Sequence, residues 1–515
     1  MGIQKLLRSK YLFYILFFLA AVAWRGWYGL SHLNFQQDTA RDIYLINEWR
    51  DSGEILLAYG PKTSIGNFFL PPLYYQIQLL FAYIFPKYIF IMNFVTILIE
   101  AFTPIILYLI LKELVGEKIS VLVSAAYIIF ALPLVFGSFA WNPNMIPFFS
   151  TLSLYCYMRA YSRKEFWLVI PASVCVAIAF NLHYQAFVLF PFSLMFFVYS
   201  LRYGWHVAKY WLMAAMIILA IFSGYIWGEV NAGFSNTQHI LHYFGSEHAQ
   251  IYDRVSKPAF IFVFLPDFLE RVVTGNDRYY FNISLGRILF FVGFFIWLYK
   301  AWKLKSGNSL HAFIFIYFIS IIIALRLYKG DKLDYYLETL YILPVFLFAY
   351  LIQLNKAFIA LLILSILLIP AYIKGNKPYN QFAELSATMS IISKNLPDNS
   401  ARVYFYNEDD INIFAFGIRK LSNISISQRD SDILEICRRN DTCIYNGLPQ
   451  CNYSRIYSRL ALLKWENGYT LEDVSYTQNY QILIGKLHKT ESSYTDIYSY
   501  NTKVGSDKLL PELYE

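Results

Sequence analysis

The residues best suited to chemistry gather in one short polar segment near the N-terminus. It reads LNFQQDTARDIYLINEWRDSG and carries Asp38, Arg41 and Asp42. Spacings of three and four residues place all three on neighbouring positions of a helix that ends near Gly53. A carboxylate beside an arginine stays ionised near neutral pH and can accept a proton from a hydroxyl group, as a general base does. We therefore predict a catalytic cluster here; the alternative is that Asp38 only caps the helix.

Two further segments carry candidate binding residues. AYGPKTSIGNFFLPPLYY supplies the cation Lys62 and the aromatic Tyr74 along a path that its glycines and prolines make rigid. Such a loop can hold an anionic group, and it can equally be an ordinary loop with an aromatic anchor. AWNPNMIPFF places the amides of Asn142 and Asn144 in a tight turn, where they can bind hydroxyl groups of a ligand.

The last two segments add one histidine and a group of lysines and tyrosines. His183, in FNLHYQAF, can titrate, ligate, or bond only to backbone. LYKGDKLDYYLETLYILP carries Lys329, Lys332, Tyr335 and Tyr336 before a long apolar run. Two lysines together suit a phosphate, and we expect Tyr335 and Tyr336 to bind it with them, although lysines at a membrane surface also interact with lipid headgroups in general.

The elements that position these segments must be membrane helices. Hydrophobic residues make up 57% of the 515 residues and charged residues only 15%, with a mean hydropathy of +0.41, which excludes an ordinary soluble globular chain. The net charge of +8 is scattered over short connections, so we expect no nucleic-acid partner. Apolar runs long enough to cross a bilayer predict eleven helices, at 11–30, 90–111, 118–136, 144–161, 165–182, 185–201, 207–228, 284–303, 309–326, 335–354 and 356–373.

The distribution of basic residues predicts the orientation. If the stretch 71–86 lies at the outer interface without crossing, the short connections rich in Lys and Arg all fall on the side of the N-terminus, which is then cytoplasmic. This topology makes 1–373 a transmembrane domain and 374–515 a small extracytoplasmic α/β domain. The candidate residues then lie in, or at the edge of, outer segments, which we place at 31–89, 137–143, 183–184, 229–283 and 327–334.

The cysteines and the remaining motifs add little. Cys437, Cys443 and Cys451 lie in the predicted outer domain, where a disulfide is permitted, but their pairing stays open. Cys156 and Cys175 fall in predicted helices and suit packing. The sequence contains no zinc-ligand spacing, no nucleotide-binding glycine loop and no repeat of 20 to 50 residues.

Taken with this topology, the outer segments resemble the GT-C superfamily, in the group that holds bacterial protein O-mannosyltransferases and lipid A aminoarabinose transferases. The family's first outer loop carries an acidic motif followed by an arginine, which is similar to Asp38 and Arg41 here, with Thr39 at the usual Glu position. Asp42 is the available substitute carboxylate. The family's PPL-Tyr segment matches Pro71 to Tyr74, and the lysine that often precedes it is Leu70 here, which makes Lys62 the candidate replacement.

The resemblance implies an inverting, mannosyltransferase-like glycosyltransferase of the cell envelope. The expected donor is a sugar on a polyprenyl phosphate, and the expected acceptor is a hydroxyl of a protein, glycolipid or glycan on the outer face of the cell membrane, in bacteria the plasma membrane. Asp38 acts as the base, and cations neutralise the leaving phosphate, so we expect no cofactor and no metal. Two alternatives remain: a transporter or flippase for a lipid-linked glycan, and an assembly or sensor subunit whose helices only anchor it.

Overall fold

The computed structural model describes residues 10–375 apart from 34, 36, 64–67, 89, 246–256, 276–284, 304–308 and 329–331, and beyond them 382, 385–387, 389–390, 394 and seven strands. Its contacts divide the chain into two units. The helical unit comprises Met1–His32 and Ile46–Pro378, and the second unit comprises Leu33–Leu45 and Tyr379–Glu515.

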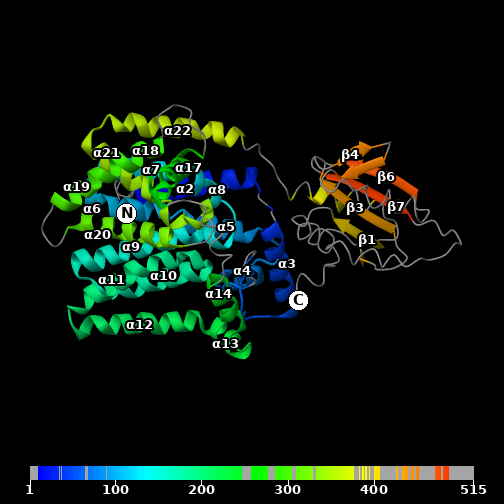
Figure 1. The fold of residues 1–515 in the computed structure, drawn as a ribbon, viewed down its shortest axis with the longest axis horizontal. Coiled ribbons are helices and arrows are strands. Elements are labelled where there is room, and N and C mark those ends of the chain that lie inside the picture. Colours follow the sequence, from blue (N-terminus) through cyan, green and yellow to red (C-terminus); the bar gives the residue numbers. More distant parts are fainter. Residues whose placement is uncertain are drawn as a thin grey trace, which may run out of the picture. The chain divides into compact units, whose positions relative to one another are not determined.

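The helical unit is built from consecutive helices joined by short connections (Figure 1). Each of the eleven stretches expected to be helical is occupied by one or more of them. The α-helices are α2 (Lys10–Ser31), α4 (Leu73–Ile84), α5 (Ile91–Glu100), α6 (Thr103–Val115), α7 (Glu117–Ile129), α8 (Ala131–Phe136), α9 (Ile146–Arg163), α10 (Val169–Leu182), α11 (Phe190–Leu201), α12 (Trp205–Ile221), α13 (Ser223–Asn231), α14 (Ser235–Gly245), α16 (Lys257–Ala259), α17 (Leu265–Thr274), α18 (Leu285–Arg287), α19 (Phe294–Lys303), α20 (Leu310–Leu327), α21 (Leu343–Leu354) and α22 (Phe358–Gly375). The α3 helix (Gln37–Ser52) begins in the second unit's first segment and ends in the helical unit.

Several short 3-10 and π segments complete the unit. The 3-10 helices are η1 (Asn142–Met145), η2 (Phe166–Leu168), η3 (Tyr184–Leu189), η6 (Asp334–Tyr336) and η7 (Glu338–Leu340). Two segments are π-helical, η4 (Phe260–Phe264) and η5 (Ile288–Gly293). Most candidate residues of the helical unit therefore lie on or beside short helices between the long ones.

Three of the predicted helices are broken in the structure. Residues 90–111 divide into α5 and α6, and residues 118–136 divide at Phe130, whose backbone is extended (ψ 139°) three residues before Pro133. Proline cannot donate the next helical hydrogen bond, which favours a break before it. Residues 207–228 form α12 and α13, which meet at a bend of 56°. Apolar periodicity predicts the helices but not these breaks.

The prediction of a single outer loop over 229–283 was incomplete. The described part of this range contains α14 and a helical run from Lys257 to Thr274 that includes η4 and α17. The α17 residues Leu265, Phe268, Leu269 and Val272 are buried and recur at helical spacing. The stretch was missed because charged residues interrupt it before it reaches the length of a membrane span.

The length and apolar composition of its helices indicate that the chain is a membrane protein. In the described residues five helices are long and apolar enough to cross a bilayer, or six if the bent α12 and α13 form one span. Three shorter apolar helices cover Phe166–Leu182, Glu338–Leu354 and Phe358–Pro370. The number of eleven spans and the orientation of the termini stay predictions.

Packing of the helical unit is dominated by aromatic side chains. The α9 helix packs against α10, α10 packs against α12, and α11 packs against α12 and α20 (Figure 1). Trp297 of α19 is fully buried and stacks on Phe346 and Tyr350 of α21, with ring centroids 5.7 and 5.1 Å away. Large rings at such contacts hold neighbouring helices against each other, because each ring buries about 150–250 Å² of surface.

The described strands of the second unit form two sheets. The larger has the order β2-β1-β3-β7-β6, from strands Ser425–Ile426, Ser400–Phe405, Asp432–Arg438, Tyr480–Lys486 and Thr470–Tyr476; β1 runs parallel to β2 and β3, whereas β7 runs antiparallel to β3 and β6. The smaller pairs β4 (Thr442–Tyr445) with β5 (Leu448–Cys451). Strands are thus present in the predicted tail domain, and its α/β class stays a prediction.

Candidate active site

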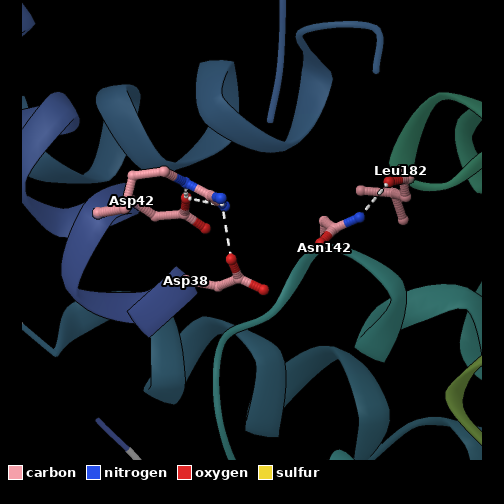
Figure 2. Close-up of polar contacts among 5 residues, drawn as sticks. Asp38, Asp42, Asn142 and Leu182 are labelled. Atoms are coloured by element: carbon pink, nitrogen blue, oxygen red, sulfur yellow. Dashed lines mark hydrogen bonds and ion pairs between the residues drawn. The ribbon is translucent and has the colours of Figure 1, made fainter. Parts of the chain in front are cut away.

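The predicted acidic cluster occupies the first two turns of α3. Arg41 donates from Nη1 to Asp38 Oδ1 at 2.8 Å, and from Nε and Nη2 to Asp42 Oδ1 at 3.0 and 2.8 Å (Figure 2). One guanidinium thus binds both carboxylates. Charge-assisted bonds of this kind favour the ionised form of a carboxylate.

The two carboxylates differ in accessibility. The side chain of Asp42 is only 2% exposed, whereas that of Asp38 is 43% exposed. A substrate hydroxyl can therefore reach an oxygen of Asp38 but not the buried Asp42. Asp38 also lies inside the first turn of α3, where a negative charge interacts favourably with the helix N-terminus. The structure thus separates a solvent-accessible carboxylate from a buried one that holds the arginine.

A second group of candidate residues comes together in the helical unit, and we call it the aromatic cluster: Trp141, His183, Tyr335 and Tyr336. Tyr335 packs edge-on against Trp141, with centroids 4.6 Å apart, and against Tyr336 at 4.4 Å. Tyr336 in turn lies 5.4 Å from the His183 ring. The connection after α8, the end of α10 and η6 each contribute to it. Segments about 150 residues apart in the sequence, such as 183 and 336, therefore meet here.

His183 is an uncharged member of the aromatic cluster. It follows α10 in extended conformation, and its side chain accepts a long hydrogen bond of 3.4 Å from the Gln185 amide. Burial lowers the pKa of this half-buried imidazole from 6.5 to about 4. At neutral pH His183 is therefore a neutral hydrogen-bonding group and does not supply a positive charge.

The two asparagines expected to face a ligand have internal partners. Asn142 Nδ2 donates to the Leu182 carbonyl at 3.0 Å (Figure 2), and Asn144 Nδ2 donates to the Phe139 carbonyl at 2.9 Å. Both side chains are buried. These bonds fix the backbone that bears Trp141 next to the backbone that bears His183. The amides thus support the aromatic cluster, and direct binding of a ligand by them stays a prediction.

Lys62 lies in a short hairpin. Lys62 and Phe69 form an antiparallel bridge, and the exposed Lys62 ammonium lies 5.8 Å from the Phe69 ring centroid. Gly60 allows the two sides of the hairpin to approach closely at its base, because a Cβ there would lie 2.2 Å from the Pro71 carbonyl oxygen. Asn236 Oδ1 accepts a hydrogen bond from the Phe69 N–H at 2.6 Å, and Asn236 Nδ2 donates to the Phe69 carbonyl at 3.1 Å. The cation is therefore carried on a braced loop.

The segment after this hairpin is braced from α10. Asn181 Oδ1 accepts from the Leu73 N–H at 2.9 Å, where α4 begins. The expected binding residue Tyr74 is almost fully buried and packs against Tyr75, with centroids 5.8 Å apart. Tyr74 thus belongs to the packing of α4, and a role in binding stays a prediction.

Two further lysines, in the segment 327–334, are predicted to bind phosphate, and the structure describes one of them. Lys332 Nζ donates to the Tyr328 carbonyl at 3.0 Å, and Lys329 lies outside the described residues. The sequence analysis missed a different ion pair in this region. Arg271 of α17 binds both carboxylate oxygens of Asp334 from Nε, at 3.1 and 3.0 Å, and Oδ1 also from Nη2 at 2.8 Å. The available signal was the amphipathic pattern LPDFLERVVT, in which Arg271 follows a buried apolar face.

Comparisons with known proteins bear on the fold of the chain. Residues 70–227 match the family model described as dolichyl-phosphate-mannose-protein mannosyltransferase. An uncharacterized protein of Aquifex aeolicus (strain VF5) is 25% identical over 309 residues, which cover 57% of this chain and 54% of that protein. The match thus spans only about half the length of this relative.

Two solved structures share the architecture. ArnT from Cupriavidus metallidurans bound to undecaprenyl phosphate superimposes with a TM-score of 0.58 at 12% identity, covering 92% of this chain and 98% of that one. The apo state of the same protein gives 0.54 at 11% identity with the same coverage. The fold expected from the resemblance is confirmed at this level, because the chain shares the fold of ArnT.

Proposed function

We propose that this chain is an inverting glycosyltransferase that moves a sugar from a polyprenyl phosphate to an acceptor hydroxyl at the outer face of the membrane. The fold is that of a glycosyltransferase whose solved structure is described as bound to undecaprenyl phosphate. The observation that carries the proposed chemistry is the difference in exposure between the two carboxylates bound to Arg41. This arginine binds a buried Asp42 and an Asp38 whose side chain is 43% exposed.

Asp38 is the proposed base. Its free carboxylate oxygen takes the proton of the acceptor hydroxyl while the hydroxyl oxygen attacks the anomeric carbon. The bond from that carbon to the phosphate oxygen breaks as the new glycosidic bond forms, and the electron pair leaves with polyprenyl phosphate. One displacement of this kind inverts the anomeric configuration. Arg41, itself bound to the buried Asp42, holds Asp38 in place.

Cations are needed where the phosphate departs. The proposed groups are Lys62, carried on its hairpin, Lys332, three residues before Tyr335, and Lys329, which lies outside the described residues. Arg271 adds a guanidinium to the same outer region, since it is bound to Asp334, the residue before Tyr335. Positive groups stabilise negative charge as it develops on the leaving oxygen. The scheme requires no metal.

The aromatic cluster is the proposed sugar-binding surface. Trp141, Tyr335 and Tyr336 offer ring faces that suit the apolar face of a pyranose, and the Tyr hydroxyls and the neutral His183 offer hydrogen bonds. Asn142 and Asn144 support it through their bonds to the Leu182 and Phe139 carbonyls. The proposed acceptor is a hydroxyl of a protein, a glycolipid or an envelope glycan.

Reconstitution tests the reaction. Purified full-length protein in proteoliposomes receives a polyprenyl-phosphate sugar labelled in the sugar and a membrane extract as acceptor pool. The proposal expects loss of donor, formation of polyprenyl phosphate and a labelled product whose anomeric configuration is opposite to that of the donor. Movement of intact donor between leaflets with no cleavage would instead support a flippase.

Orientation is tested separately by cysteine labelling. In a variant lacking the native cysteines, a cysteine at the exposed position 54 should react with a membrane-impermeant thiol reagent from outside, and one at the exposed position 303 should not. The proposed orientation rests on the positive-inside distribution of Lys and Arg. Labelling of position 303 from outside would reverse the topology and remove the proposed site from the outer face.

A further inference from the structure

The helical unit contains charged residues in its interior that the proposed reaction does not use. We call Arg25, Glu100, Tyr127 and Glu338 the buried ionic cluster. They come from α2, the end of α5, α7 and η7, and each is at most 1% exposed. Ionisable side chains inside a membrane domain are costly, so they persist where they have a definite role.

Electrostatic interactions connect the four residues, and no hydrogen bond or ion pair joins any two of them in the described part of the chain. Arg25 interacts with Glu100 and with Tyr127. Tyr127 interacts with all three of the others, and Glu338 interacts with Glu100. Gly137 brings the backbone against the guanidinium, because a Cβ at this position would lie 2.8 Å from Arg25 Nε. The cluster is therefore one packed group.

The two acids have different hydrogen-bond environments. Glu100 accepts from the Phe148 N–H at 3.0 Å and from the Thr103 hydroxyl at 3.2 Å, and bonds of this type favour a carboxylate. Neither oxygen of Glu338 has a hydrogen-bond partner among the described residues. One guanidinium can balance only one of the two acids. Since Glu100 interacts with Arg25 and has donors, it is the member suited to carry the charge.

Several polar atoms of the cluster are buried without a direct hydrogen bond. In the part of the chain that the structure describes, the three guanidinium nitrogens of Arg25, the Tyr127 hydroxyl and both Glu338 oxygens have no protein hydrogen-bond partner. Buried polar atoms are almost always satisfied, and ordered water serves where protein groups do not reach. Water suits this group because it accepts from the guanidinium and donates to a carbonyl oxygen.

We propose that the buried ionic cluster is a hydrated site in which Arg25 and Glu100 carry the two opposite charges without direct contact, Glu338 holds a proton, and ordered water bridges Arg25, Tyr127 and Glu338. The site anchors η6, which carries Tyr335 and Tyr336, to the helical unit, because Glu338 lies two residues after Tyr336. Gly137 joins the other side of the aromatic cluster to the same site, four residues before Trp141. Glu338 is thus a positioning residue, whether or not the chain transfers a sugar.

Paired substitutions distinguish the charged acid from the neutral one. Arg25→Met with Glu100→Met removes both charges and leaves a neutral Glu338, so the melting temperature in detergent should stay within about 5 °C of the wild type. Arg25→Met with Glu338→Met leaves Glu100 charged and without a balancing charge, so the melting temperature should fall by about 6 to 15 °C. The reverse order, or equal effects, would overturn the assignment.

Milder variants and a direct observation guard against unfolded double variants. Glu338→Gln should stay within about 2 °C of the wild type, because it matches a neutral acid, whereas Glu100→Gln should melt several degrees lower. Hydrogen exchange of the amides at 335–341 should rise in Glu338→Ala and not in Glu338→Gln; equal exchange in both would refute the anchoring role. High-resolution cryo-electron microscopy should show solvent density between Arg25 and Glu338. Direct contact of these side chains, with no solvent, would refute the hydrated site.

Discussion

The ion pair between Arg271 and Asp334 offers a sharp test of how the aromatic cluster is held in place. Asp334 begins η6, and its carbonyl also accepts from the Tyr341 hydroxyl at 3.2 Å. Arg271→Ala removes the only side chain of α17 that is seen to bind this carboxylate in the described residues. We expect Tyr335, the next residue, to lose its fixed position against Trp141.

The size of the effect follows from exposure and geometry. The side chains of Arg271 and Asp334 are 19% and 27% exposed, between the limits of a surface pair and a buried pair. Exposed pairs contribute about 0 to 1 kcal/mol and breaking a buried pair costs about 3 to 5 kcal/mol. The bidentate geometry favours the middle of this range, so Arg271→Ala should cost about 1 to 3 kcal/mol. Arg271→Lys keeps the charge but loses the fork, and should cost about half as much.

A double-mutant cycle provides the assay. Thermal unfolding in detergent is measured for Arg271→Ala, Asp334→Ala and the double variant, and donor KM is measured alongside. The coupling energy should be about 1 to 2 kcal/mol, with a raised donor KM in both single variants. A coupling near zero together with an unchanged KM would refute the view that this pair positions the aromatic cluster.

Two further predictions follow from the environments of single groups. Arg41→Met should lower the free energy of unfolding by about 3 kcal/mol, because it removes two charge-assisted bonds from the buried Asp42; calorimetry in detergent measures this, and a loss below about 1 kcal/mol would contradict it. Since burial lowers the pKa of His183 to about 4, the unfolded chain binds this proton more readily between pH 4 and 6.5, so stability should fall as the pH falls through this window. His183→Gln should remove that part of the pH dependence of the melting temperature, and an unaltered dependence would contradict the assignment.

The sequence predicts much of the fold because long apolar runs are a strong, local signal. All eleven expected stretches contain helices, and α3 ends at Ser52, next to the expected end at Gly53. Helix breaks depend on tertiary packing and on single residues such as Phe130, so periodicity does not reveal them. The run from Lys257 to Thr274 was missed for the opposite reason, because its charges mask a helix that only tertiary contacts bury.

The candidate site is predictable in its residue types and less so in its contacts. The spacing of Asp38, Arg41 and Asp42 indicated a shared helix face, and the arginine does bind both carboxylates. Which carboxylate is buried could not be read from spacing, since burial depends on what packs against the helix. Contacts between distant segments, such as His183 with Tyr336 and Arg271 with Asp334, leave no local trace in a single sequence.

The measurement that tests the central claim most directly is glycosyl transfer by Asp38→Asn, with Asp42→Asn as the matched control. Asn keeps the shape and the hydrogen-bonding capacity of Asp38 but cannot accept the acceptor's proton, so turnover should fall by about 10²- to 10⁴-fold. The melting temperature should change little, because Asp38 is 43% exposed. Asp42→Asn should lower stability and retain a larger part of the turnover. Full turnover by Asp38→Asn, or loss of transfer in Asp42→Asn alone, would contradict the assignment of Asp38 as the base.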